Sequence, residues 1–367
     1  MREDWEYKTF GEIGTFLRGK NIQKADFVSG GLPCIHYGQI HTKFDISIDY
    51  HLSEITQEVY DKAIIASPGD VIIAITSEDI DGSCKSVVWS GNYDIAVSAH
   101  AAILKHNMNG KFIAYYLRSN TFFTQKLKYA RGFKVMEIKT KDLAKLVLPI
   151  PPKPTQLSIV SELDKLNELI QIKKEQLKDY DVLAQSIFYE MFGDPVENEK
   201  GWEVKKFGDL FKLKSGDGLS SKDFNTGIYP VYGGNGISGY HNSFNMKGCY
   251  IIIGRVGVYC GNVRKVDGEF WLTDNAFRLI YKEKEQNPFF ILYLLNILDL
   301  HQYANAAAQP VISNLTLKSI NVPLPPLSLQ QSFAHKIEQI ERQKAEVQKT
   351  ITDLESLLAA RMQYWFD

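Results

Sequence analysis

The strongest constraint on this chain is that it repeats itself, because a rigid proline-rich entry into a helix occurs twice at one offset. LPIPPKPTQLSIVSELDKL (residues 148–166) returns at an offset of 174 as VPLPPLSLQQSFAHKIEQI (residues 322–340). The alignment has no gap, and it pairs Pro149, Pro151, Pro152 and Gln156 with Pro323, Pro325, Pro326 and Gln330. A chain with such a repeat is expected to build one structural unit more than once.

The repeat continues outside the proline motif. WEYKTFGEIGTFLRG (5–19) matches WEVKKFGDLFKLKSG (202–216) at an offset of 197, and FIAYYLRS (112–119) resembles FILYLLNI (290–297). The offset shrinks toward the proline motif, so the two copies differ by loop insertions within a shared frame. Divergent loops in matching frames predict two copies of one module that face different targets.

Each copy has the same predicted order of elements. Segments rich in β-formers, such as GDVIIAIT and CYIIIGRVGVYCG, are separated by Gly and Asn turns. GRVGVYCGN and YGGNGISGY are predicted to be hairpin turns. A helix is expected at 111–128 in the first copy and at 288–302 in the second, followed by a loop, the proline motif and a long helix.

The long helices carry apolar residues at heptad spacing, which predicts a coiled coil. The first seam is Leu163, Leu166, Ile170, Lys173, Leu177, Tyr180, Ala184, Ile187 and Met191, and the second is Ile337, Ile340, Lys344, Val347, Ile351, Leu354, Leu358, Arg361 and Trp365. Ser328 with Gln331 fits a capping box, and Gly193 with Pro195 ends the first helix. A helix of this length spans about 55 Å, more than one small domain covers. Two helices packed separately on their own domains are the alternative.

The fold class expected is α+β, with two pseudo-repeated α/β domains joined by two long helices that form an antiparallel coiled coil. The predicted boundaries are residues 1–151 for the first domain, 152–195 for the central helix, 196–326 for the second domain and 327–367 for the C-terminal helix.

Composition favours a cytoplasmic protein. Apolar residues make up 44% and charged residues 23% of the chain, and the formal net charge is -1. We expect no transmembrane helix and no secretory signal, because the sequence has neither a run of about 18 apolar residues nor an apolar stretch at its start. The cysteines (Cys34, Cys84, Cys249, Cys260) form no CxxC, and the scattered histidines (His36, His41, His51, His100, His301) have no metal-ligand spacing, so we expect no metal site.

Catalytic motifs are missing from the sequence. It contains no GxxxxGK[ST], no GxGxxG between a strand and a helix, no HExxH and no GxSxG. Asn287-Pro288-Phe289-Phe290 is similar to the Asn-Pro-Pro-Tyr/Phe tetrapeptide of amino-methyltransferases, but its third residue is Phe and no cofactor-binding segment precedes it. Asn as N-cap and Pro at the first helical position explain the stretch without chemistry.

Two related units on a stiff spacer suit a target with two features at a fixed distance, and DNA is such a target. A separation of about 40–55 Å corresponds to roughly 12–16 base pairs. The densest basic run, residues 126–145, contains seven Lys or Arg against two acids, although a solvated face explains such a run equally well.

The doubled WExxxxG entry, YPVYGGNGISGY, the doubled proline–Gln–long helix frame and MFGDP together resemble the specificity subunit of type I restriction–modification systems. The resemblance covers essentially the whole chain, although the first copy has LPCIHYGQIHTKF in place of YPVYGGNGISGY. It implies two target recognition domains that each read one half of a split double-stranded DNA sequence. It also implies a coiled coil that sets the spacer and docks two methyltransferase subunits, with two restriction subunits joining in the nuclease. The subunit itself is expected to have no activity and no cofactor, since S-adenosylmethionine, ATP and Mg belong to the partners.

Candidate DNA contacts follow from loop position and side-chain chemistry. In the first domain they are Lys20, Asn21, Tyr37, Gln39, Ser77, Lys85, Arg131 and Lys134; in the second they are Ser215, Lys222, Tyr232, Asn235, Ser238, Arg255, Asn305 and Gln309. An ordinary surface or turn role is as good an explanation for any single one, and Tyr232 could belong to the core. Two other functions stay open: a coiled-coil scaffold that reads no DNA, and a self-contained DNA methyltransferase.

Overall fold

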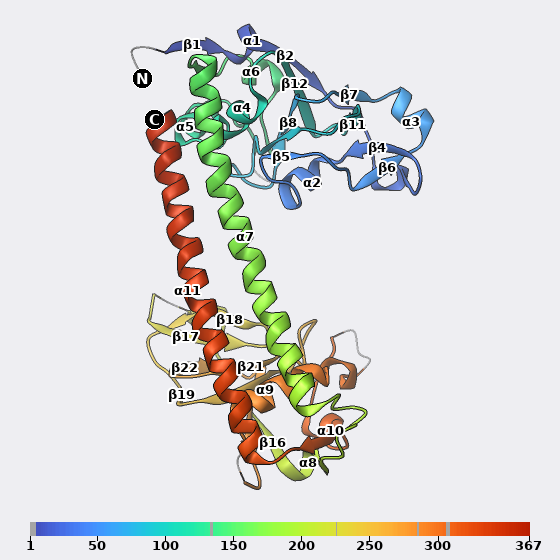
Figure 1. Cartoon of the computed structure of the whole chain (residues 1–367), viewed down its shortest axis with the longest axis vertical. Helices are drawn as coiled ribbons and strands as arrows, with labels where there is room; N and C mark the ends of the chain where they lie inside the picture. Colours follow the sequence, from blue (N-terminus) through green and yellow to red (C-terminus); the bar gives the residue numbers. More distant parts are fainter. Residues whose placement is uncertain (1–4, 133–134, 225, 285, 306–308) are drawn as a thin grey trace. The chain divides into compact units, whose positions relative to one another are not determined.

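The computed structural model describes residues 5–132, 135–224, 226–284, 286–305 and 309–367 (Figure 1). The chain divides into two compact units, Met1–Ile172 with Thr350–Asp367, and Lys173–Lys349, called here the first and second domains. Two helices, α7 (Lys153–Phe192) and α11 (Leu327–Phe366), each contribute to both domains. No helix among the residues described is long and apolar enough to cross a membrane.

The first domain combines short strands and short helices. Its strands are β1 (Glu6–Thr9), β2 (Gly14–Arg18), β3 (Phe27–Val28), β4 (Leu32–Ile35), β5 (Ser47–Ile48), β6 (Ser53–Ile55), β7 (Ile64–Ala66), β8 (Val71–Ala74), β9 (Thr76–Ser77), β10 (Ser86–Trp89), β11 (Ile95–Val97), β12 (Ala101–His106), β13 (Met136–Glu137) and β14 (Val147–Ile150). Its helices are α1 (Phe10–Ile13), α2 (Tyr37–Thr42), α3 (Gln57–Asp61), α4 (Gly110–Tyr116), α5 (Asn120–Lys126) and α6 (Thr140–Leu143), with the 3₁₀ turn η1 (Lys24–Asp26).

The second domain repeats this composition with fewer elements. Its strands are β15 (Glu203–Lys206), β16 (Phe211–Ser215), β17 (Tyr229–Gly233), β18 (Gly236–His241), β19 (Met246–Lys247), β20 (Tyr250–Gly254), β21 (Val263–Val266), β22 (Glu269–Leu272), β23 (Ala276–Tyr281) and β24 (Asn321–Leu324). Its helices are α8 (Phe207–Leu210), α9 (Pro288–Ile297) and α10 (Asn314–Leu317), with the 3₁₀ turns η2 (Ser221–Asp223) and η3 (Leu300–Tyr303).

The strand order of the two domains is the same wherever both have the element. The central sheet runs β2-β12-β8-β10-β5 in the first domain and β16-β23-β20-β21 in the second. A second sheet, β3-β6-β4-β11-β7 or β18-β17-β22-β19, contains one parallel pair in each case, β4 with β11 and β17 with β22. The outer ladder β1·β14 recurs as β15·β24. The internal repeat is therefore a repeat of topology.

The matching segments 5–19 and 202–216 both end at a glycine for the same steric reason. A Cβ on Gly19 would lie 2.2 Å from the carbonyl oxygen of Ser98, and one on Gly216 would lie 2.2 Å from that of Leu272. Only glycine lets the chain pass this close to the end of the parallel pair.

The proline motif has the same structure in both copies. Gln156 Nε2 donates to the Pro151 carbonyl at 2.8 Å, and Gln330 Nε2 donates to the Pro325 carbonyl at 2.9 Å. Both glutamines are buried. The predicted capping box at Ser328 is wrong, because α11 begins at Leu327 and the Pro326 carbonyl accepts from the first turn.

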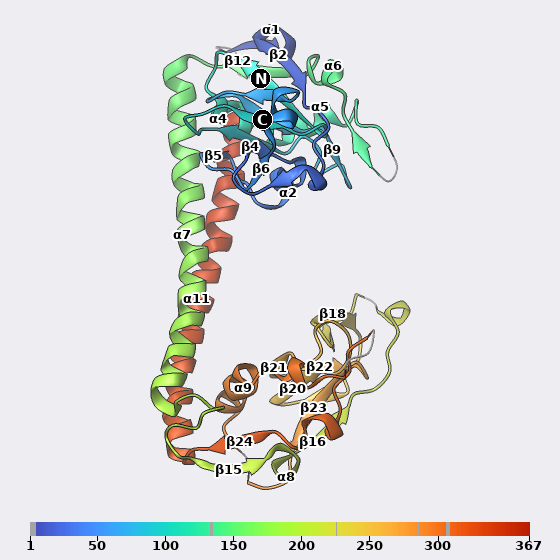
Figure 2. The same cartoon turned by 90° about the vertical axis from the view of Figure 1, so that its right-hand side faces the viewer.

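The long helices α7 and α11 pack together and run antiparallel, which confirms the expected fold class (Figures 1 and 2). In the second domain Lys344 pairs with Asp181 at 2.7 Å, while Phe333, earlier in α11, contacts Phe188 and Phe192, later in α7. The first and last residues of α11 lie at the same offset of 174 from those of α7, as the proline motif requires.

The seam residues and the domain cores are continuous. All the described side chains of both predicted seams are buried or half-buried. Phe366 packs into the first domain's core with Ile159 and Leu163, and Ile337 packs into the second domain's core with Phe188. Residues of α7 and α11 therefore form part of the hydrophobic core of each domain.

Local predictions fared unevenly. Asn287 is the N-cap of α9, with its side chain accepting from the Phe289 amide and Pro288 at N1, as the helix-start interpretation requires. β17 and β18 form the expected hairpin. The helix expected at 111–128 is broken, because Ser119 caps a second helix, α5. The helix expected at 288–302 ends at Ile297, and Asp299, with a φ of 43°, begins a separate 3₁₀ turn.

Candidate functional site

In each domain, several predicted contact residues lie on the loops that follow the parallel strand pair, β4 with β11 in the first domain and β17 with β22 in the second. In the first domain Lys20 forms a parallel bridge with Ser98, the residue that follows β11. Ser98 Oγ accepts from the Tyr37 amide at 2.9 Å. Lys20 and Asn21 are exposed beside this point. The structure thus brings together the Gly19 turn and the start of α2.

Tyr37 lies in a cluster of histidines. Its ring centroid is 4.6 Å from that of His36, 4.8 Å from that of His100 and 6.2 Å from that of His41. Burial is the main cause that lowers the pKa of His36. The sequence interpretation gave these histidines no role: His36 and His41 lie beside Tyr37 in the sequence, but His100 comes from a segment far along the chain. The signal was the position of His100, two residues beyond Ser98.

Lys85 and Ser77 join the same cluster through His41. His41 Nε2 donates to the Thr76 carbonyl at 3.0 Å, and Lys85 Nζ donates to the His41 carbonyl at 2.8 Å. Burial is the main cause that lowers the pKa of Lys85. Ser77 follows Thr76 in β9. The segments that carry four of the predicted contact residues therefore meet at the Tyr37–histidine cluster. These residues are Lys20, Tyr37, Ser77 and Lys85.

Other predicted residues of the first domain have local roles. Gln39 Nε2 donates to Ser53 Oγ at 2.7 Å and its Oε1 accepts from the His36 amide at 3.0 Å, so its side chain stabilises the start of α2. Arg131 is exposed and bridges Glu137 in β13, the strand that pairs with β9. Lys134 lies outside the described residues.

In the second domain a hollow of about 650 Å³ lies at the corresponding place. Residues from the β17–β18 hairpin, the loop after β22 and the loop after β16 line it: Leu219, Ser220, Ser221, Phe224, Gly233, Gly234, Asn235, Gly236, Ile237, Ser238, Thr273 and Asn275. Asn235 is exposed at the turn, and its carbonyl accepts from Arg264. Ser238 Oγ donates to the Val231 carbonyl at 3.2 Å.

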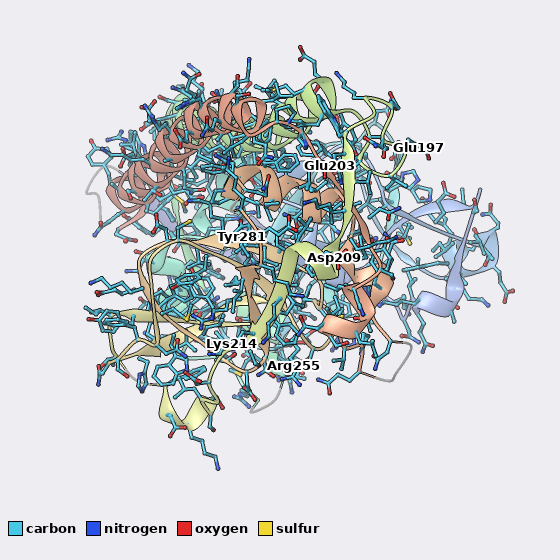
Figure 3. All side chains as sticks on the ribbon, turned by 90° about the horizontal axis from the view of Figure 1, so that it is seen from below. Glu197, Glu203, Asp209, Lys214, Arg255 and Tyr281 are labelled. Atoms are coloured by element: carbon cyan, nitrogen blue, oxygen red, sulfur yellow. The ribbon has the colours of Figure 1, made fainter. Side chains whose placement is uncertain are left out.

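Arg255 lies at the edge of this hollow, directly after β20. Its amide donates to the Asn275 carbonyl at 2.9 Å. Its Nη1 donates to Ser215 Oγ and to the Asp274 carbonyl, both at 3.3 Å, and its guanidinium carbon is 5.4 Å from the Phe277 ring centroid. Figure 3 labels Arg255 together with Lys214, the neighbour of Ser215. These are long hydrogen bonds to neutral acceptors, so the guanidinium keeps donors available for an anion or a base.

The remaining predictions in the second domain divide by exposure. Tyr232 is half-buried, and its ring packs on that of Phe270 with 5.4 Å between the centroids. Its pKa is raised mainly by burial, so its environment is that of a core tyrosine. Lys222 and Gln309 are exposed. Asn305 Oδ1 accepts from the Val311 amide at 2.9 Å, and the Asn305 amide donates to the Val311 carbonyl. That pair is the counterpart, at the repeat offset, of Arg131 with Glu137.

A different kind of candidate surface lies on the helix pair. A groove of about 470 Å³ in the first domain is lined by Ser158, Ser161, Glu162, Lys165, Leu166, Leu357 and Arg361. A groove of about 650 Å³ in the second domain is lined by Leu183, Ile187, Lys336, Gln339, Ile340, Arg342, Gln343 and Glu346. At the repeat offset, five positions of one groove fall on five of the other: 162 on 336, 165 on 339, 166 on 340, 183 on 357 and 187 on 361. We call them the first and second helix grooves.

Metal chemistry finds no support in the part of the chain that the structure describes. It contains no group of three or more His, Cys, Asp or Glu side chains that could hold a metal ion. Burial raises the pKa of the Cys34 and Cys84 thiols to about 12, which makes both poor nucleophiles.

Comparison with known proteins agrees with this doubled layout. The model of the type I restriction modification DNA specificity domain matches twice, over residues 2–179 and 199–356. The type I restriction enzyme EcoprrI specificity subunit of Escherichia coli is 27% identical over 241 residues, which span 60% of this chain and 58% of that protein. The MjaVIII specificity subunit of Methanocaldococcus jannaschii is 20% identical over 97% of this chain and 92% of that protein.

Solved structures support the fold. The S subunit of a type I restriction-modification system from M. genitalium aligns with 99% of this chain and 96% of its own at a TM-score of 0.58 and 16% identity. A chain from a structural study of complex assembly and conformational transition in a type I R-M system aligns with 99% of this chain and 97% of its own at a TM-score of 0.60 and 17% identity.

Proposed function

Because the chain belongs to the type I restriction modification DNA specificity family, in which it carries two copies of the specificity domain, we propose that it reads a bipartite double-stranded DNA target. One half of the target is read by each domain. The observation that carries this proposal is the gathering of the same loops beside the parallel strand pair in both domains.

The chemistry of those loops suits base reading. In the second domain, Arg255 and Asn235 provide a guanidinium and a side-chain amide, which can bridge guanine and adenine respectively in the major groove. In the first domain, Lys20, Lys85 and the Tyr37–histidine cluster provide cationic and aromatic groups at the equivalent place. Since the two sets differ in residue type, the two half-sites differ in sequence.

The helix grooves are the proposed docking sites for methyltransferase subunits. The two grooves occupy equivalent positions in the repeat, so a partner that fits one has a second, related position. Two methyltransferase subunits per chain follow from this duplication, and two restriction subunits join the complex in a restricting system. Both grooves combine leucine with charged side chains, and an interface between subunits that also exist apart is about as polar as the rest of the protein surface.

Catalysis belongs to the partners in this proposal. S-adenosylmethionine, ATP and Mg bind to the methyltransferase and restriction subunits, and the chain acts with them in the cytoplasm. Its own task is to choose the DNA sequence and to hold the partners at the correct distance from each half-site.

Genome-wide mapping of adenine methylation, with and without this gene, tests the function. We expect loss of one split motif, made of two short half-sites around a fixed spacer, when the gene is deleted. An unchanged methylome in a strain whose partner methyltransferase is expressed and active would overturn the proposal and favour a scaffold without DNA reading.

A further inference from the structure

The loop after the third strand of the central sheet is held by a basic side chain in both domains. In the first domain, Lys126 Nζ donates to the Ser83 carbonyl at 2.7 Å and to the Asp81 carbonyl at 3.3 Å. In the second domain, His301 Nδ1 donates to the Cys260 carbonyl at 2.9 Å. We call residues 77–85 the first loop and residues 255–262 the second loop.

The two loops have the same backbone around the held carbonyl. The next residue has a positive φ in each, 65° at Cys84 and 89° at Gly261. Its amide returns to the preceding strand, from Cys84 to the Ala74 carbonyl at 2.9 Å and from Gly261 to the Gly254 carbonyl at 2.8 Å. A positive φ is uncommon outside glycine, so Cys84 indicates that this geometry is maintained in the first loop against its local preference.

Lys126 and His301 therefore make the same kind of hydrogen bond to a loop carbonyl, one through an ammonium group and the other through an imidazole. Lys126 ends α5, and His301 lies in η3, which follows α9 at the corresponding point of the repeat. Both reach the carbonyl of the residue that precedes the positive φ. Agreement between two domains that differ in sequence is evidence that the contact matters to what the loops do.

The burial of Lys126 strengthens this argument. The residue is only 3% exposed, and burial is the main cause that lowers its pKa. Placing an ammonium in such a site is costly, whereas an apolar side chain of the same length would fill the space without that cost. Within the described residues, its hydrogen-bond partners are the two loop carbonyls. Holding the loop explains why a lysine is there.

The side chains that the loops present differ between the domains. The first loop carries two exposed carboxylates, of which Asp79 accepts from the Gly82 amide at 2.6 Å within the loop, so Glu78 is the acceptor that the loop offers. The second carries Arg255 at its base and, farther along, Val258 and Tyr259, which are 78% and 52% exposed. Carboxylates suit the amino groups of cytosine, while an exposed valine suits the methyl group of thymine. Either kind of side chain can distinguish one base from another only if the loop holds it at a fixed distance from the base edges.

We propose that Lys126 and His301 are positioning residues that fix the first and second loops for sequence discrimination, each for the half-site of its own domain. This inference rests on the proposed DNA-reading function. It assigns to the loops a share of the specificity and to the two basic residues the task of holding them.

The test is selection from a randomised duplex DNA library by the full-length chain, followed by sequencing of the bound fraction. The variants are Lys126→Met and His301→Ala, with Lys128→Met and Gln302→Ala as controls that change exposed neighbours. His301→Asn is the conservative variant, because the asparagine amide can donate from near the position of Nδ1. Thermal unfolding is recorded for every variant.

We expect Lys126→Met to lower the base preference at positions of one half-site by at least about fivefold, and His301→Ala to do so at the other half-site. Affinity for unrelated DNA and the preference at the opposite half-site should stay unchanged, and His301→Asn should keep the preference that His301→Ala loses. A purely structural role would instead lower the unfolding temperature and weaken both half-sites together.

The outcomes separate the two levels of the proposal. If the unmodified chain shows no sequence preference, the DNA-reading function fails. If it shows a preference that folded Lys126→Met and His301→Ala both retain, the positioning role is rejected while the function stands. If Lys126→Met does not fold, the comparison of His301→Ala with His301→Asn decides in the second domain.

Discussion

Leu183 in α7 and Leu357 in α11 occupy equivalent places of the repeat, are each 46% exposed, and each line the helix groove of their own domain. Large apolar side chains exposed at matching positions indicate that both surfaces serve the same kind of contact. Val182, the neighbour of Leu183, is 66% exposed but does not line a groove.

This relationship predicts how docking can be blocked one partner at a time. Leu183→Glu and Leu357→Glu should each weaken one methyltransferase contact by on the order of 100-fold, because a charged carboxylate would replace an apolar side chain in the contact that the partner buries. Native mass spectrometry of the reconstituted complex should show one methyltransferase subunit lost from each single variant and both lost from the double variant. Val182→Glu is the control and should keep both subunits. A full complex with the double variant would place docking elsewhere.

The two glutamines of the proline motif predict unequal losses of stability. Among the described residues, the Gln330 side chain makes three hydrogen bonds, to the Pro325 carbonyl, to Gln286 and from the Asn287 amide, whereas the Gln156 side chain makes one, to the Pro151 carbonyl. Gln330→Ala should lower the free energy of unfolding by about 2–3 kcal/mol, since it leaves buried polar groups unpaired, and Gln156→Ala by about 1 kcal/mol.

Urea unfolding of the full chain, followed with domain-resolved hydrogen exchange, measures both effects. Gln331→Ala, which changes the exposed neighbour of Gln330, should change the free energy by less than about 0.5 kcal/mol. Equal losses from the two buried glutamines would contradict the argument, because it depends on the number of hydrogen bonds that each one makes.

The repeat, the long helices and the local caps could be predicted because their signals are local or periodic. The constant offset of the proline motif predicted that the two long helices correspond residue for residue, and Asn287-Pro288 marked a helix start by its own chemistry. The capping box at Ser328 failed because the helix starts two residues earlier than that motif requires, with the Pro326 carbonyl accepting the first helical hydrogen bonds.

The site was only partly predictable, since its residues come together through non-local strand pairing. Tyr37 and His41 share α2, but His100 reaches Tyr37 because β4 pairs with β11 in parallel, and no local pattern predicts a parallel pair of such short strands. Lys126 was visible only as part of a basic run. Its burial and its hold on the Ser83 carbonyl depend on where α5 ends relative to β8.

A pH dependence follows from the pair between the two long helices in the first domain. Glu162 accepts from Arg361 and, at 3.1 Å, from Trp365 Nε1, and the bond from Arg361 is the main cause that lowers the pKa of Glu162. A carboxyl group whose pKa is lowered by folding stabilises the folded state at pH values above its ordinary pKa of 4.5. This stabilisation is lost as the pH falls through the lowered pKa of the folded state.

Glu162→Gln should therefore cost about 1 kcal/mol at neutral pH, a modest figure because both partners are about one-third exposed, and should cost nothing once the pH lies well below the lowered pKa. Urea unfolding at a series of pH values measures the difference. Glu168→Gln, at an exposed position of the same helix, is the control and should show no such difference. A constant difference across the acid range would reject the ion pair as its source.

Arg255 offers the sharpest test of DNA reading by a single side chain. Arg255→Ala should remove discrimination at one position of one half-site by a factor of about 5 to 150, the value of one bidentate base contact. Arg255→Lys should restore little of it, because an ammonium cannot form the two parallel hydrogen bonds of a guanidinium. Lys349→Ala, which removes a positive charge from an exposed position of α11 in the same domain, should leave discrimination intact.

Binding to duplexes that differ at single positions measures this effect, with the number of bound methyltransferase subunits recorded in parallel. Recognition of the other half-site and assembly with the methyltransferase should survive in Arg255→Ala, because Arg255 contacts Ser215 and Asp274 of its own domain, away from the groove residues. Loss of assembly without loss of recognition would reject the assignment of Arg255 as a reader.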